Sequence, residues 1–267
     1  MKNVINAVFL SAITIIVVFS SCVNNNVNSS KYNEQQSNFD KFLADYRKMS
    51  HAQKNDIQKK EFMNKFENDL FKYVDSVKLL VNWRGQIKDI KTREINKNST
   101  SIEFYISYKP EQYREVKFKC LYTTPTDSLP KDHIYNSVKN ISNYSTVFFD
   151  GIIRTSNKGN VKYYLDNPGS DLNIPYPDYE FFIVEVGTTN RGDTLSTNLQ
   201  KAIEYSYKIT EPLKLNYLKK ISNKEKEARW KALEPKFNSA KAKLTKQENE
   251  YLTRLNQALT LNFLYGD

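Results

Sequence analysis

Between residues 37 and 80 the hydrophobic side chains recur at a helical period. A first helix is predicted by side chains three or four residues apart, at Phe39, Phe42, Leu43 and Tyr46. Ser50 and Gln53 have the spacing of a capping box, which would start a second helix. The stripe of that second helix is Phe62, Phe66, Leu70, Val74 and Val77. We expect residues 37–80 to form an N-terminal helical segment that packs against a following sheet.

From residue 81 the period changes to two. The runs VNWRGQIKDI, SIEFYISY and EVKFKCLY predict three half-buried antiparallel strands. Their inward positions are Trp83, Gly85, Ile87, Ile102, Phe104, Ile106, Tyr108, Val116, Phe118, Cys120 and Tyr122. LPKDHIYNSVKNIS predicts a short helix, and TVFFDGIIR a fourth strand with Gly151 at a bulge. After a loop at residues 166–178, YEFFIVEVGTT is apolar at nearly every position, so we expect a strand that is covered on both faces.

The remaining residues, 190–267, are expected to form a basic helical segment. Ser222 with Glu225, and Thr245 with Glu248, have the capping-box spacing, and Pro235 should kink or break the helix between them. The formal net charge of the chain is +10, and residues 212–257 alone hold twelve basic and five acidic residues. Charge on a helical segment is more often a solvated face than a ligand site, so the basic balance alone does not indicate a partner.

The order strand, strand, strand, short helix, strand, strand is that of an OB-fold, a five-stranded partly open barrel. We therefore expect an α+β protein, in which a five-stranded OB-like antiparallel barrel over residues 81–189 is flanked by N-terminal and C-terminal helices. NWRGQIKDI, with a glycine in the first strand, and VFFDGII, with one in the fourth, resemble the OB-fold lipoproteins of Bacteroidetes and the tRNA-anticodon-like domains related to them.

The N-terminus has the features of a secretory signal. Lys2 precedes an apolar run from Val4 to Phe19, which is shorter than the roughly 20 residues that a bilayer span needs. We expect a signal peptide over residues 1–21, with a transmembrane anchor as the alternative. A polar stretch follows, and it predicts a flexible tether over residues 22–36.

The sequence Phe19-Ser20-Ser21-Cys22 resembles the lipobox of bacterial lipoproteins, with Phe19 where that family usually has Leu. The resemblance implies cleavage before Cys22 and acylation of Cys22 with chains such as palmitate, so that the protein is a membrane-anchored lipoprotein of the cell envelope. Few acidic residues follow Cys22, unlike in surface-exported members of the group, which favours an outer-membrane anchor with the body facing the periplasm.

No reactive constellation stands out along the chain. Of the two cysteines, Cys22 would carry lipid and Cys120 would be a core residue, which leaves no disulfide. His51 and His133 have no metal-ligand spacing, and neither a G-x-S-x-G motif nor a phosphate loop is present. We therefore predict no catalytic residue, no metal and no cofactor, and expect the protein not to be an enzyme.

Binding is the function class that the pattern favours. OB-folds bind ligands across strands 2 and 3, where the outward side chains, joined by two from strand 1, are Arg84, Lys88, Tyr105, Lys117 and Lys119. One aromatic side chain among four cations is suited to an anionic ligand. The alternative is that these cations only solvate an exposed sheet face. We expect a binding or assembly module for an envelope protein or an anionic glycan, and an envelope location disfavours nucleic acid.

Two further functions stay open: an immunity or inhibitor-type protein that acts through the basic C-terminal helices, and an enzyme of unrecognised type. Two motifs add a candidate modification. Asp127-Ser128-Leu129 and Asp193-Thr194-Leu195 resemble the O-glycosylation motif of periplasmic and surface proteins of Bacteroidetes, which makes Ser128 and Thr194 candidate sites. A third match, at Ser76, lies inside a predicted helix. The sequence does not indicate the oligomeric state.

Overall fold

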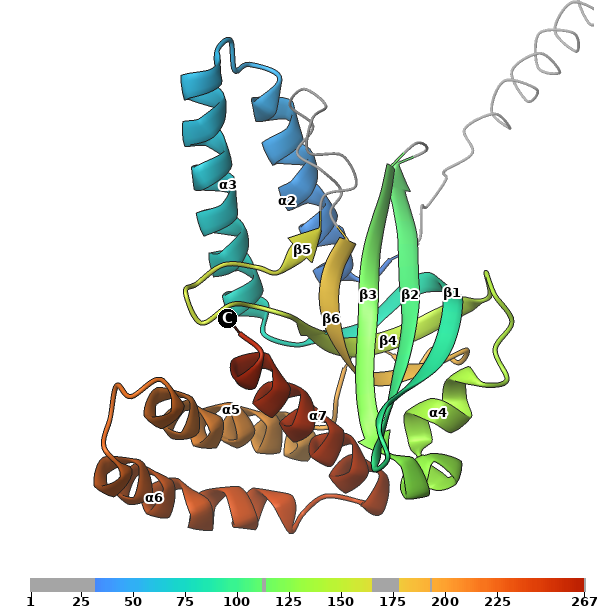
Figure 1. Cartoon of the computed structure of the whole chain (residues 1–267), viewed down its shortest axis with the longest axis vertical. Coiled ribbons are helices and arrows are strands. Elements are labelled where there is room, and N and C mark those ends of the chain that lie inside the picture. The colour runs from blue at the N-terminus through green and yellow to red at the C-terminus, as the bar shows by residue number, and fades with distance from the viewer. Residues whose placement is uncertain (1–31, 112–113, 165–177, 193, 267) are drawn as a thin grey trace, which may run out of the picture. The chain divides into compact units, whose positions relative to one another are not determined.

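The computed structural model describes residues 32–111, 114–164, 178–192 and 194–266 (Figure 1). The predicted signal peptide, Cys22 and the first part of the tether lie outside the described residues, as do most of the predicted loop at 166–178 and Asp193. Among the helices in the described ranges, none combines the length and the apolar character needed to cross a membrane.

Five strands close into a barrel, which confirms the predicted α+β fold with an OB-like barrel and helical flanks (Figure 1). They are β1 (Leu80–Asn96), β2 (Ser99–Glu111), β3 (Arg114–Pro125), β4 (Thr146–Ile153) and β6 (Asp178–Gly187). The pairing order is β3-β2-β1-β4-β6, and β6 pairs again with β3. A sixth, two-residue strand, β5 (Tyr163–Tyr164), pairs with β6 beside the barrel.

One pairing differs from the expected antiparallel barrel, because β3 and β6 run parallel. Strand direction cannot alternate all the way round a ring of five, so at least one neighbouring pair must be parallel. The four other barrel pairings are antiparallel. Between β3 and β4 the chain forms a short 3-10 helix, η2 (Thr126–Lys131), and the predicted short helix α4 (His133–Val138).

Aromatic side chains fill the barrel. Trp83 is fully buried, and its ring centroid lies 5.9 Å from that of Phe118, which in turn lies 5.1 Å from that of Phe181. The predicted inward positions of β1, β2 and β3 are all buried, including Cys120. Burial raises the pKa of the Cys120 thiol well above its ordinary value, which suits a core residue. The alternation of the sequence thus identified the barrel interior.

The N-terminal helices α2 (Glu34–Ser50) and α3 (Asp56–Val77) pack on this same core through the predicted stripes. The ring of Phe39 lies 5.5 Å from Trp83 and 5.7 Å from Tyr179, centroid to centroid, so α2 packs against aromatic side chains of the barrel core. The predicted capping box at Ser50 is wrong. Ser50 is the last residue of α2 and its hydroxyl donates to the Arg47 carbonyl, whereas the side chain of Asn55 caps α3.

The end of the predicted tether is also corrected, because α2 begins at Glu34, inside the 22–36 range. Asn33 caps the helix and donates to the Val81 carbonyl at 2.8 Å. The Gln36 side chain donates to the Arg84 carbonyl at 2.9 Å and accepts from the Arg84 N–H at 3.0 Å. These amides act as hydrogen-bond partners for the β1 backbone, which the composition of a polar stretch does not reveal.

The C-terminal segment forms α5 (Thr197–Tyr217), α6 (Asn223–Lys241) and α7 (Lys246–Leu264). The capping box at Thr245 is confirmed, and Ser222 caps α6. The helix α6 is continuous through Pro235, so the predicted break does not occur there.

A second core joins these helices to the outside of the barrel. Phe182 and Val184 of β6 face α5 and α7 in this core, whereas Tyr179 and Phe181 face the barrel interior. The prediction that this strand is covered on both faces is confirmed.

Candidate functional site

The strand register brings part of the predicted ligand face together. Lys88 on β1 lies opposite Tyr105 on β2, and Tyr105 lies opposite Lys119 on β3. Lys117 is two residues away on the same side of β3. Arg84 lies apart from this row, because its register partner is Phe148 on β4. Four of the five predicted residues therefore share one surface of the barrel.

Carboxylates surround these cations. Lys88 Nζ lies 3.1 Å from a carboxylate oxygen of Glu115, and Lys117 Nζ lies 3.5 Å from Asp178. Lys119 has Glu180 as its register partner on β6. Burial alone would raise the pKa of Glu115, but a hydrogen bond from Ser107 and the charge of Lys88 hold it below its ordinary value. The positive charge of this face is largely balanced within the barrel, which favours a solvated, self-paired surface over an anion site.

The two candidate glycosylation residues are exposed. Ser128 lies in η2, with its hydroxyl 3.3 Å from Asp127, and Thr194 lies in the loop before α5. Ser76 lies inside α3 and its hydroxyl donates to the Tyr73 carbonyl at 2.7 Å. Exposure makes modification of Ser128 and Thr194 sterically feasible, and the modification itself stays a prediction.

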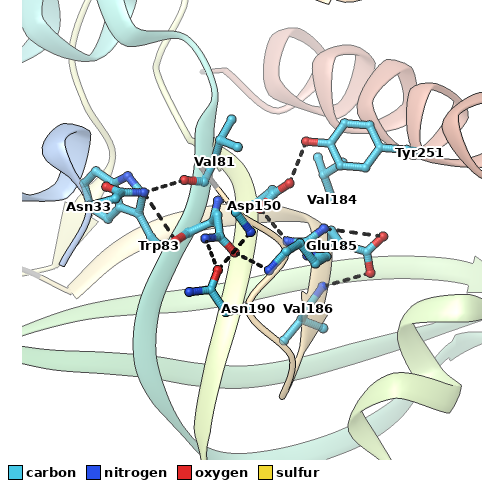
Figure 2. Close-up of polar contacts among 12 residues, drawn as sticks. Asn33, Val81, Trp83, Asp150, Val184, Glu185, Val186, Asn190 and Tyr251 are labelled. Carbon is cyan, nitrogen blue, oxygen red and sulfur yellow. Dashed lines mark hydrogen bonds and ion pairs between the residues drawn. The ribbon is translucent and has the colours of Figure 1, made fainter. Parts of the chain in front are cut away.

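A network of ion pairs around the buried Asp150 and the partly buried Glu185 joins the barrel to the C-terminal segment (Figure 2). The sequence analysis missed this network. The Asp150 side chain on β4 is 1% exposed. Its Oδ1 accepts from the Asn82 N–H at 2.7 Å and from Arg191 Nη2 at 2.6 Å, and its Oδ2 accepts from the Tyr251 hydroxyl at 2.8 Å. Burial raises the pKa of Asp150 above its ordinary value although these three partners oppose the shift.

Asn82 positions two of the groups that bind Asp150, its own backbone N–H and Arg191. It lies at an irregularity of the β1–β4 register with a φ of 52°, a left-handed conformation that asparagine tolerates better than most residues. Its side chain accepts from the Arg191 N–H at 3.3 Å and donates to Asn190 at 2.8 Å (Figure 2). The strand irregularity thus fixes the loop that delivers the Arg191 guanidinium to Asp150.

Glu185 on β6 is the second carboxylate of the network. Its Oε1 lies 2.5 Å from His133 Nε2 on α4, and its Oε2 accepts from Arg254 Nη2 on α7 at 2.5 Å. Arg191 Nη1 lies 4.0 Å from Oε2 and links the two carboxylates. Burial alone would raise the pKa of Glu185, but the hydrogen bond from His133 and the charges of Arg254 and Arg191 outweigh it and lower the pKa.

The network links separate elements of the fold through carboxylates whose oxygens all have partners. Every carboxylate oxygen of Asp150 and Glu185 has a partner, and none of these partners is a serine, threonine or cysteine that could act as a nucleophile. No group of three or more histidine, cysteine or acidic side chains in the described ranges is arranged to hold a metal ion. Both carboxylates interrupt strongly apolar runs, FFDGII and IVEVG, and such a charge in a buried strand is the sequence signal for a buried partner.

The basic helix α6 offers a different kind of surface. It packs against α5, and Ala240 alone is buried along its length, all of which the structure describes. Trp230, Leu233 and Phe237 are half-buried at helical spacing. The helix α6 contains six basic and three acidic residues. This helix therefore carries a net charge of +3, out of +10 for the whole chain, outside the barrel.

Comparison of the chain with models of known protein families, with curated proteins and with solved structures gives no match.

Proposed function

We propose that this protein is a bacterial lipoprotein, anchored in the outer membrane through an acylated Cys22 with its body facing the periplasm. We propose that it acts by binding an envelope protein or an anionic glycan and catalyses no reaction. The observation that carries the binding role is the position of the surplus positive charge, on the exposed α6 and the turns around it. A cation-rich, water-exposed helix raises the local concentration of anionic partners.

Three observations support the proposed lipid anchor and binding role. Cys120 is buried, so the thiol that remains for acylation is that of Cys22. The titratable groups with shifted pKa values in the buried network are held by partners on α4, α7 and the strands. Lys88 and Lys117 of the barrel face are paired with carboxylates, whereas α6 has twice as many basic as acidic residues.

The immunity or inhibitor-type alternative would use the same helices, but deleting these helices cannot test it. Deleting residues 222–267 would remove α7, whose Leu252, Leu255 and Ala258 lie in the second core and whose Tyr251 bonds to Asp150. Such a deletion would unfold the protein whatever its function. Substitutions on the exposed side of α6 test the idea without that loss.

The anchor is tested by fractionation. The full-length precursor is expressed in a bacterium of the envelope type proposed, as wild type and as Cys22→Ser. We expect the wild type in the outer-membrane fraction and the variant released to the periplasm or retained unprocessed. A wild type found in the cytosol with residues 1–21 attached contradicts the proposal.

The binding role is tested by photo-crosslinking in intact cells. A photoreactive amino acid replaces Lys231 on the exposed side of α6 in one strain and Ile95 at the far end of β1 in another. Ile95 is 55% exposed and serves as the control. We expect a discrete adduct from position 231 and none from position 95. Equal labelling at both positions, or none at either, contradicts a specific surface on α6.

A further inference from the structure

The facing sides of α5 and α6 form a shallow, solvent-open pocket of about 270 Å³. Asn198, Lys201 and Tyr205 line it from α5, at a spacing that places them on one helix face. Lys236 and Ser239 line it from α6, and Lys243 from the turn that leads to α7. The two helices pack against each other, so the pocket has walls from both.

The charged side chains that line this pocket are all positive. The lining includes three lysines and no aspartate or glutamate. In the part of the chain that the structure describes, no carboxylate lies within 4.0 Å of the ammonium groups of Lys201, Lys236 or Lys243. Glu204, three residues after Lys201 on α5, does not line the pocket and is ion-paired with Lys208. The hydrogen bond from Lys208 and, to a smaller extent, the charge of Lys201 lower the pKa of Glu204. This arrangement contrasts with the barrel face, where carboxylates accompany the lysines.

Three like charges around a small concavity repel one another, and an anion that enters removes this repulsion. A cleft lined by one sign of charge also concentrates ions of the other sign. The Asn198 amide and the Ser239 hydroxyl add neutral hydrogen-bonding groups, and Tyr205 and Pro235 add apolar walls. The pocket is slightly smaller than the about 300 Å³ at which sites for drug-sized ligands begin, so it suits a single small ring or acid group.

We propose that this pocket binds the acidic group of an anionic saccharide, a sugar that carries a carboxylate or a phosphate. The lysines would neutralise the acid, and Asn198 and Ser239 would hydrogen-bond to hydroxyl groups of the sugar. The inference rests on the proposed binding function and gives that function a ligand class and a site.

The first experiment is lysine footprinting by acetylation and mass spectrometry, on the full mature lipoprotein in detergent micelles. The probes are trigalacturonate for a carboxylate, glucose 6-phosphate for a phosphate, and maltotriose as the neutral sugar. We expect one of the acidic probes to protect Lys201, Lys236 and Lys243, and maltotriose to protect none of them. Lys219, Lys220 and Lys224, which lie outside the pocket on the same helical segment, serve as controls and should not change.

The second experiment compares two triple variants by calorimetry with the acidic probe that protects. Changing Lys201, Lys236 and Lys243 to Gln should weaken binding by about tenfold or more, whereas changing Lys219, Lys220 and Lys224 to Gln should change it by no more than about twofold. Both variants lose the same charge, so an equal loss would mean diffuse attraction and would overturn a pocket site. Circular dichroism and the melting temperature verify that both variants fold.

Other outcomes also overturn the inference. Protection by vesicles containing phosphatidylglycerol, with no effect of the acidic sugars, would mean that these lysines contact a lipid surface. Absence of protection by every probe would mean that the pocket holds no such ligand. If the saccharide fails while crosslinking from position 231 still captures a discrete partner, only this inference fails, and if both fail, the proposed binding function fails with it.

Discussion

At the scale of single residues, Gly151 shows how tightly the barrel closes. A Cβ atom built there would lie 2.4 Å from the Phe182 carbonyl oxygen and 2.4 Å from Cε1 of Phe181. The register of β4 against β6 shifts at this point, as expected for the bulge that the sequence predicted. Because backbone cannot yield as a flexible side chain can, only glycine fits this approach of two strands.

We predict that Gly151→Ala lowers the free energy of unfolding by about 3 kcal/mol, the upper end of the usual range for overpacking. Gly187→Ala is the matched control, since nothing lies within 4 Å of the Cβ position there. The control should be neutral or stabilise by less than about 1 kcal/mol, because alanine restricts the unfolded chain. Urea denaturation monitored by tryptophan fluorescence measures the free energy of unfolding of both variants. An equal change in the two variants would contradict the close approach of β4 and β6 at Gly151.

Glu185 makes stability depend on pH. Its pKa in the folded protein lies below the ordinary value of 4.5, so the charged form is the one that folding favours. Its contribution is therefore fully present above pH 4.5 and is lost as the pH falls through the lower, folded pKa. The charged groups that face it are His133 on α4, Arg191 in the loop after β6, and Arg254 on α7.

We predict that Glu185→Gln lowers the free energy of unfolding by about 1–3 kcal/mol near pH 6, and that its difference from wild type narrows towards about pH 3. Glu225→Gln, which removes an exposed pair with Arg229 on α6, should cost less than about 1 kcal/mol. Denaturant titrations across this range provide the measurement. A difference from wild type that grows as the pH falls would contradict the lowered pKa.

Single residues also show which structural features could be predicted from the sequence and which could not. Alternation placed Trp83, Phe104, Phe118 and Cys120 correctly in the interior, because side-chain direction in a strand follows directly from position. The partners of Asp150 could not be read in this way, since Tyr251 is 101 residues away in the chain. Such pairings depend on how helices dock, which local patterns do not encode.

At the scale of elements, α2 is joined to β1 by side-chain amides. The Gln36 side chain is fully buried and satisfies both the N–H and the carbonyl of Arg84. Gln35 accepts from the Trp83 indole N–H at 2.6 Å and donates to the Leu79 carbonyl at 3.0 Å. These bonds fix the helix to a backbone segment where β1 would otherwise leave polar groups unpaired.

We predict that Gln36→Leu costs about 1–3 kcal/mol, because a leucine of similar size leaves both backbone groups of Arg84 unsatisfied in a buried place. The backbone amide hydrogen of Arg84 should also exchange faster in the Gln36→Leu variant than in the wild type. Asn38→Ala, an exposed change on the same helix, is the control and should leave both quantities nearly unchanged. Slow exchange at Arg84 in the leucine variant would contradict the role of Gln36.

Element boundaries were harder to predict than element types. The sequence indicated every barrel strand, but Ser50 proved to end α2, and α2 began before the predicted tether ended. Caps are local hydrogen-bond choices among several polar residues, and Asn55 competes with Ser50 for the same role. The candidate site was predicted only in part, because the charges on α6 were visible in the sequence but the α5 wall of the pocket was not.

At the scale of the whole molecule, the reactivity of the two cysteine thiols tests whether Cys22 carries a lipid. Cys120 is fully buried and its pKa is raised by burial, so it should resist thiol reagents until the protein unfolds. We predict that the protein purified from membranes reacts at no thiol when native and at one when denatured, as measured by maleimide labelling and mass spectrometry. A free Cys22 would instead give one reactive thiol in the native state and two after denaturation.

The two-sided burial of β6 has a consequence for how this architecture can be altered. Successive residues of one strand belong to different cores, Phe181 to the barrel and Phe182 to the helices. An unrelated helical segment therefore cannot simply replace α5–α7, because the outward-facing side chains of β6 form part of the surface against which these helices pack. A recombinant that grafts α5–α7 onto another OB-like barrel would have to carry alternate positions of this strand along with them.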